Sequence, residues 1–293
     1  AVQLFLFYFI LQIHASALSL YFIFLAEDIL LFYFAYKNGC FIHNFKFFKL
    51  PRGVKLNEII LILLIVIQLI FLFFNAVSRP TITFDSLAMW SFKAKTLYYE
   101  NGIDFNPDSA VYLGGGGHIN YPWLIPLSQF WMHETLGEYN DLTTNFIFFF
   151  YFVFIIILLY YFIRKYASRF IPHLPQTPRS STSEIMGSKE IIPAGPDAPL
   201  EGAGFIGLLF SFMFYTMTLI FYHDYNVYAD LPLGYYGLIA FALLFSWTKD
   251  KERKDLILSA IFFGIALWVK TEALFFISSS ALVLGYYLFS SKF

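Results

Sequence analysis

The chain contains a single cysteine, Cys40, and little charge of either sign. One cysteine excludes an intramolecular disulfide and any zinc site built on cysteines. Charged residues make up 13% of the chain, whereas a soluble domain carries about 25%. The formal net charge is −1, and no basic domain stands out, which argues against a partner made of nucleic acid.

Apolar residues, in contrast, are abundant. They make up 59% of the 293 residues, and 39 of these are phenylalanine. One soluble core cannot bury that much apolar surface, because single cores stop growing at about 250–300 residues. Disorder is excluded as well, since it requires low hydrophobicity and high net charge. The composition therefore predicts an all-α polytopic integral membrane protein whose solvent is lipid.

Membrane-spanning helices need about 20 consecutive, mostly apolar residues. Such runs predict spans at 58–77, 141–163, 204–222, 231–247, 256–270 and 273–290. Residues 1–36 are also apolar and form either one long span or a clipped helix and a full one, with a break near His14. We therefore expect a bundle of seven or eight transmembrane helices.

The chain divides into four parts at the sequence level. An N-terminal apolar helix or pair of helices and a basic loop occupy 1–57, and 58–163 holds a core helix, the long loop 78–140 and a return helix. Residues 164–203 are rich in proline and serine, which predicts a flexible linker. Residues 204–293 hold the C-terminal spans. Because the chain starts at Ala1 and stops at Phe293 after an apolar run, we expect it to be a piece of a longer protein.

The distribution of basic residues predicts the orientation in the membrane. Most of the 19 lysine and arginine residues fall in 37–57, 164–203, 248–255 and at the C-terminus. By the positive-inside rule these segments are cytoplasmic. The loops 78–140, 223–230 and 270–272 then face outward.

The long outer loop differs from the linker because it is rich in aromatic residues. Apolar residues between Ser86 and Glu100 have the spacing of an amphipathic helix lying on a membrane surface. A second such stretch runs from Trp123 to Leu136. Four consecutive glycines, 114–117, lie between them and must be mobile or closely approached by another group.

Isolated polar residues near membrane helix ends require a reason, because desolvating a charge costs several kcal/mol. Here they gather on the outer side, which predicts one outward-facing site. Its candidate substrate-binding residues are Lys93, His118, Tyr121, His223, Asp224, Asp230, Lys270 and Glu272, beside Asp85 as the candidate catalytic residue.

Each candidate also has a purely structural interpretation. Asp85 can cap the helix that begins near Ser86, and Asp230 can cap the helix that follows it. Lys270 and Glu272 can form an interfacial turn whose side chains reach the headgroups.

The remaining candidates carry weaker signals. His118, beside the glycines, can be an ordinary loop histidine. His223 and Asp224, with Asp85, are candidate ligands of a divalent metal ion, but so few ligands make a weak pattern. The glycine run lacks the lysine and hydroxyl residue of a phosphate loop.

Four local patterns occur in a characteristic order. They are TFDSLAMW at 83–90, followed by Lys93-Ala94-Lys95; HINYPWLIP at 118–126; YADLPL at 228–233; and WVKTEA at 268–273. The set resembles the GT-C class of membrane glycosyltransferases, in particular bacterial members near the protein-mannosyltransferase and aminoarabinose-transferase branch, also called family 39. The second pattern resembles the family's YPxLxP stretch. The fourth resembles a K-x-E-G turn, with Ala273 where glycine is more usual.

The resemblance implies a GT-C-like bundle in a bacterial inner membrane, with its active site facing outward. Such an enzyme takes a sugar from a polyprenyl-phosphate donor and transfers it to a lipid, glycan or protein acceptor. Asp85 matches the acidic residue that serves as general base or orients the acceptor, although many relatives carry adjacent acids there. The resemblance implies that no cofactor is required and that a divalent metal ion assists the transfer weakly or not at all.

The expected chemistry suits the candidate residues. Glycosyl transfer develops positive charge on the sugar, and a base must take the acceptor proton. The departing phosphate needs cationic or hydrogen-bonding donors, for which Lys270, His118, Lys93 and Lys95 are candidates. Tyr121, Trp123 and Trp131 can stack on a sugar or simply anchor the loop at the interface.

Two other classes of function compete with this hypothesis. A transporter or flippase of lipid-linked or small polar cargo would also be a helical bundle, although such proteins place charged groups near the bilayer midplane. A non-catalytic scaffold is the third possibility. The crowding of polar residues on one face favours an enzyme at the interface.

Overall fold

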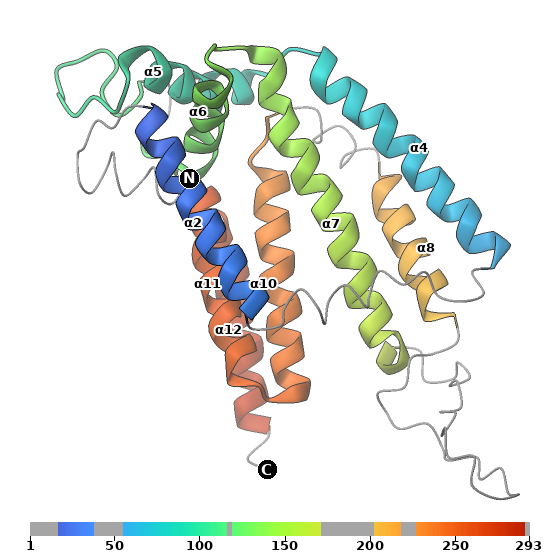
Figure 1. The fold of residues 1–293 in the computed structure, drawn as a ribbon. Coiled ribbons are helices and arrows are strands. Elements are labelled where there is room, and N and C mark those ends of the chain that lie inside the picture. The colour runs from blue at the N-terminus through green and yellow to red at the C-terminus, as the bar shows by residue number, and fades with distance from the viewer. Residues whose placement is uncertain (1–16, 38–54, 116–118, 171–201, 218–226, 291–293) are drawn as a thin grey trace, which may run out of the picture.

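The computed structural model of the chain describes residues 17–37, 55–115, 119–170, 202–217 and 227–290 (Figure 1). Within these ranges the regular structure is helical, with one isolated β-bridge between Asp104 and Tyr112. The predicted all-α fold is therefore confirmed for this part of the chain.

Long apolar helices form the body of the molecule. They are α4 (Leu56–Ser78), α7 (Asp141–Phe170) and α10 (Asp230–Asp250). Among the described residues, these 3 helices are long and apolar enough to cross a membrane. A polar residue or proline follows each predicted run, so the ends of α4 and α10 fall close to the predicted ones.

Further helices accompany these three. They are α2 (Ala17–Lys37), α8 (Ala203–Tyr215), α11 (Arg253–Val269) and α12 (Ala273–Ser290). Helix α2 starts just after the predicted break near His14, and α8 ends well before residue 222, where we expected it to end.

Helix α7 is longer than predicted, so the linker begins later than residue 164. The helix continues through Arg164 and Lys165, whose charge suggested a loop. Arg164 Nη1 donates to Tyr160 Oη at 3.2 Å, one turn earlier, and Lys165 Nζ lies 3.5 Å from Asp250 of α10. Such contacts offset the weak apolar character of this last stretch.

Two short helices, α5 (Phe92–Glu100) and α6 (Leu124–Leu136), lie across one end of the bundle, which we call the loop end (Figure 1). They match the predicted surface helices at 86–100 and 123–136. The first of these opens as a π-helix, η3 (Ser86–Ser91), which continues directly into α5. Helix α6 ends at Gly137, whose left-handed φ of 74° closes the helix.

Small residues let the helices approach closely. A Cβ on Gly207 of α8 would lie 3.0 Å from Tyr160 of α7, and one on Gly237 of α10 would lie 2.8 Å from Phe276 of α12. Ser259 of α11 donates to the carbonyl of Ala240 in α10 at 2.8 Å. Close packing around small residues is how helices associate in lipid, where no hydrophobic driving force acts between them.

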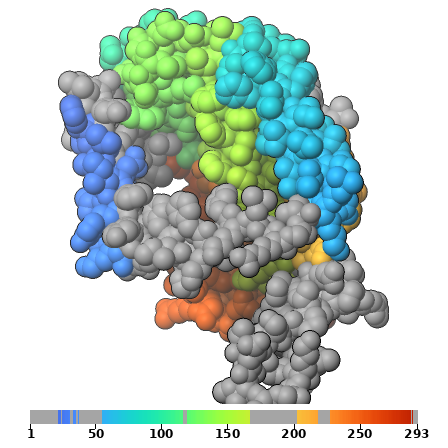
Figure 2. Space-filling model, turned by 45° about the vertical axis from the view of Figure 1, so that its right-hand side comes forward, coloured from blue at the N-terminus to red at the C-terminus, as the bar shows by residue number. Residues whose placement is uncertain are grey.

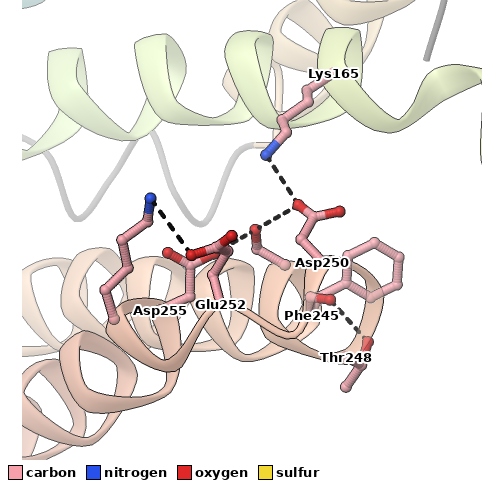
Figure 3. Close-up of polar contacts among 8 residues, drawn as sticks. Lys165, Phe245, Thr248, Asp250, Glu252 and Asp255 are labelled. Atoms are coloured by element: carbon pink, nitrogen blue, oxygen red, sulfur yellow. Dashed lines mark hydrogen bonds and ion pairs between the residues drawn. The ribbon is translucent and has the colours of Figure 1, made fainter.

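The opposite end of the bundle is held by polar contacts (Figure 3). Lys165 reaches from α7 to Asp250 at the end of α10. The buried Ser246 hydroxyl lies 2.7 Å from Asp255 Oδ2 and 3.3 Å from Asp250 Oδ2. These contacts tie α7, α10 and α11 together at the end remote from α5 and α6.

Candidate functional site at the loop end

The segment between α4 and the π-helix is fixed by α7. Asn145 of α7 is fully buried, and its Nδ2 donates to the carbonyl of Arg79 at 2.8 Å. Thr81 Oγ1 lies 3.4 Å from Asn145 Oδ1. The chain that carries Asp85 is thus tethered to the bundle where it leaves α4.

Asp85 is exposed in the first turn of the helical stretch that becomes the π-helix. Its backbone is helical, with φ −61° and ψ −40°, and its carboxylate makes no capping hydrogen bond. The hydroxyls of Thr83 and Ser86 bond to each other instead. The capping interpretation of Asp85 is therefore wrong, and its carboxylate remains available to solvent or a ligand. Single-turn π-helices occur frequently at functional sites.

Three predicted site residues form one ionic cluster. Lys270 Nζ lies 2.8 Å from Asp230 Oδ1 and 3.4 Å from Glu272 Oε1. Lys270 ends α11, Glu272 lies in the turn before α12, and Asp230 begins α10. The helix-capping position before α10 is occupied by Ala229, so the capping interpretation of Asp230 is also wrong.

The Lys270 ammonium is partly shielded, since its side chain is 19% exposed. Burial on its own would lower the pKa of Lys270, but hydrogen bonds and charge from Asp230 and Glu272 outweigh it and raise that pKa. Lys270 is thus held as a cation at the loop end. The cluster carries two carboxylates for one ammonium, so its formal net charge is −1, and Lys270 with one remaining carboxylate forms a neutral pair.

Lys93 has a different environment, inside the layer formed by α5 and its loop. It is 1% exposed, and its Nζ donates to the carbonyls of Ile119 at 2.9 Å and Tyr121 at 3.1 Å. The ammonium also lies 4.9 Å from the centre of the Trp123 ring. Burial lowers the pKa of Lys93 to about 8.

The predicted close approach at the glycines is confirmed for the two that the structure describes. Gly114 has φ +81°, and a Cβ there would lie 3.1 Å from both Lys93 Cγ and Trp123 Cη2. Gly115 has φ +64°, and its Cβ would lie 3.0 Å from Phe92. Only glycine fits both the backbone conformation and the space at Gly114.

Tyr121 connects the loop with the core. Its ring is half-buried and meets Trp90 of the π-helix edge to face, with ring centres 5.2 Å apart. Trp90 belongs to the main hydrophobic cluster, which also contains Ala229 and Val269. The neighbours of Asp230 and Lys270 along the chain thus share a core with Tyr121 and the π-helix.

A cavity of about 640 Å³ lies between α6, α7 and α10. Figure 2 shows an opening beside α2, whereas the cavity itself is lined by residues of α6, α7 and α10. Its walls are mostly aromatic and aliphatic: Ser128, Trp131, Met132, Thr135, Leu136, Phe146, Ile147, Phe150, Tyr151, Phe154, Tyr235 and Tyr236. Its size is that of ordinary small-molecule sites.

The cavity and the ionic cluster both include residues of α10. Tyr235 and Tyr236 follow Asp230 on α10 by roughly 8 Å of helix rise. Trp131 lines the cavity, and both Trp131 and Trp268 pack on the cluster that contains Leu127 and Phe130 of α6. Trp268 lies near the end of α11, two residues before Lys270 in the sequence.

Two buried polar residues of α6 were not predicted as site residues. Gln129 and His133 are fully buried, and the Gln129 amide atoms and His133 Nε2 have no hydrogen-bond partner among the described residues. His133 Nδ1 accepts from the Asn140 backbone N–H at 3.3 Å, and burial lowers the pKa of His133. Their one-turn spacing on a helix with apolar neighbours was the available signal.

Three candidates, His118, His223 and Asp224, lie outside the described residues. Two of the three proposed metal ligands are therefore among them. In the described ranges, no group of three histidine, cysteine or acidic side chains comes close enough to hold a metal ion.

In chemical terms, the loop end offers a carboxylate exposed on a π-helix, a held ammonium between two carboxylates, and an apolar cavity below them. Such a set can bind a molecule with a polar head and an apolar tail. In comparisons with known proteins, the chain matches no family model, no curated protein and no solved structure.

Proposed function

We propose that the protein is a membrane glycosyltransferase that uses a polyprenyl-phosphate sugar. The observation that carries the proposal is that α10 holds both Asp230 of the ionic cluster and, at Tyr235 and Tyr236, part of the lining of the 640 Å³ apolar cavity. A polyprenyl-phosphate sugar has the matching parts: an apolar chain for the cavity and a charged phosphate for Lys270. The order of the four sequence patterns supports the same class.

The proposed reaction uses Asp85 and Lys270. Asp85 accepts the proton of an acceptor hydroxyl while the acceptor oxygen bonds to the anomeric carbon. The bond between that carbon and the phosphate oxygen breaks, and its electron pair leaves with the polyprenyl phosphate. Lys270 donates hydrogen bonds to the phosphate as its charge increases, after giving up one carboxylate partner. The cluster then re-forms when the product leaves.

We further propose that the bundle has seven or eight spans in a bacterial inner membrane. The described helices α2, α8, α11 and α12 would add to the three long ones. Lys165, Lys249 and Lys254 lie at the end of the bundle away from α5 and α6. By the positive-inside rule, this supports an outward-facing loop end.

The experiment that tests the proposal is a transfer assay. Purified protein in liposomes is incubated with a panel of radiolabelled polyprenyl-phosphate sugars and a membrane extract as acceptor. We expect label to move from the donor to an acceptor with wild-type protein and not with Lys270→Met. Equal transfer by both proteins, or none with any donor, would contradict the proposal.

A transporter or flippase is the second candidate, and the cavity supports it too. The hydroxyls of Tyr151 and Tyr236 lie 3.2 Å apart within the long apolar helices α7 and α10, and both residues line the cavity. A pair of hydroxyls within the apolar helices can donate hydrogen bonds to a polar cargo that crosses the membrane. Uptake of lipid-linked sugar into liposomes, without any transfer to an acceptor, would favour this function over the first.

A further inference from the structure

Lys93 combines deep burial with a full set of neutral contacts. It is 1% exposed, and the contacts of its ammonium among the described residues are two backbone carbonyls and an indole ring. Burying an ammonium is costly unless its hydrogen bonds are satisfied. The side chain therefore has a structural task that offsets this cost.

The segment that Lys93 holds has no regular structure of its own. Residues 119–123 form turns and bends between the glycines and α6. The carbonyls of Ile119 and Tyr121 both point at Lys93 Nζ, and Trp123 covers the ammonium from another side at 4.9 Å. One side chain of α5 thus fixes alternate residues of this segment.

The part of the loop at the start of the glycine run also contacts the Lys93 side chain. Gly114 packs against the aliphatic part of Lys93, where a Cβ would lie 3.1 Å from Cγ. Gly114 and residues 119–121 therefore both contact Lys93. Tyr121, which Lys93 holds through its carbonyl, reaches Trp90 of the π-helix that follows Asp85.

We propose that Lys93 is a positioning residue that holds Tyr121 and its neighbours over the loop-end site, and that it does not itself contact the donor phosphate. The effect of Lys93 on catalysis rests on the proposed function. Its role in ordering residues 119–123 does not depend on that function. Lys93 acts through Tyr121, whose ring packs between the π-helix and the loop. Lys270 then remains the cation that meets the phosphate.

The test compares Lys93→Met with Lys254→Met by hydrogen–deuterium exchange and by transfer kinetics. Lys254 is the control because it is an exposed lysine of α11, at the end of the bundle away from the loop end. In Lys93→Met we expect amides of 114–123 to exchange at least about tenfold faster, as loss of charge-assisted hydrogen bonds implies. Exchange in α4, α7 and α10 should not change in either variant.

Kinetics separate positioning from phosphate binding. Lys93→Met should lower kcat while the KM for the donor stays within about threefold, as expected for an interaction not made with the bound donor. Lys93→Arg should recover part of kcat and part of the exchange protection. Unchanged exchange in Lys93→Met would overturn the inference. A large rise in the KM for the donor would also overturn it, because it would assign Lys93 to donor binding.

Two further outcomes are distinguishable. If no donor is turned over by wild-type protein, the proposed function fails, but the exchange comparison still decides the role of Lys93. If Lys93→Met does not fold, Trp123→Phe replaces it, because a smaller ring holds the ammonium less strongly. Faster exchange at 119–123 is then expected, and wild-type exchange would overturn the inference.

Discussion

Lys270 Nζ lies 2.8 Å from Asp230 Oδ1, and this contact joins the turn between α11 and α12 to the first turn of α10. Glu272 adds a second carboxylate at 3.4 Å. Exposed ion pairs contribute little to stability, typically about 0–1 kcal/mol. The stability that this cluster contributes is therefore expected to be small, which is consistent with the role in ligand binding that we propose for Lys270.

Replacing Lys270 by methionine should impair transfer far more than it impairs folding. Loss of one donor to a developing negative charge lowers kcat by about 10²–10³-fold. Lys249→Met, at the opposite end of the bundle and exposed, is the matched control and should retain wild-type turnover. Initial rates at saturating donor measure both, and equal loss in the two variants would mean a general effect of charge.

Asp85→Asn should abolish most activity, because an amide cannot take up the acceptor proton. Loss of a positioned general base costs about 10²–10⁴-fold in rate. Asp108, an exposed acid in the same loop, provides the control Asp108→Asn, which should behave as wild type. Transfer rates and donor KM are measured together; a change confined to KM would assign Asp85 to binding.

Gly114→Ala should destabilise the protein more than Gly137→Ala. Both glycines have left-handed φ, +81° and +74°, but only Gly114 has neighbours within 4 Å of an added Cβ. The backbone term costs about 1 kcal/mol at each position, and the clash with Lys93 and Trp123 adds to it at Gly114. Thermal unfolding followed by tryptophan fluorescence gives the order, and identical midpoints would show that the loop yields without cost.

Cys40 provides a test of orientation, because it is the only cysteine. It falls in the basic segment 37–57, which we expect to be cytoplasmic. A membrane-impermeant maleimide should label Cys40 only after the membrane is opened. In a Cys40→Ser background, Asp108→Cys should be labelled in intact cells. The reverse pattern would place the loop end inside.

Much of the helical layout could be predicted from the sequence, because runs of apolar residues determine it. The predicted helix 58–77 lies within α4, and the amphipathic stretches gave η3, α5 and α6. The grouping of Asp230, Lys270 and Glu272 also followed from their shared side of the membrane. Charge misled the prediction at Arg164 and Lys165, because Arg164 bonds to Tyr160 within α7 and Lys165 pairs with Asp250 of α10.

The rest depends on contacts between distant segments. Lys93 has the sequence surroundings of a surface cation, and contacts with Gly114, Ile119 and Tyr121, distant in the sequence, bury it. The cavity exists because α6 crosses above α7 and α10, which helix periodicity in one segment does not determine. The π-helix likewise has no distinct pattern in its residues.

Photolabelling tests most directly whether the ionic cluster and the cavity form one donor site. A polyprenyl-phosphate sugar with a diazirine in its lipid chain is bound to the protein and irradiated, and labelled peptides are identified by mass spectrometry. We predict adducts on the α6, α7 and α10 residues that line the cavity, prevented by excess unlabelled donor and reduced by Ile147→Trp, which fills the cavity. The control Ile157→Trp, on an exposed face of α7, should leave labelling unchanged. Adducts spread over the exposed face of α4, or labelling that excess donor does not prevent, would contradict a donor site in this cavity.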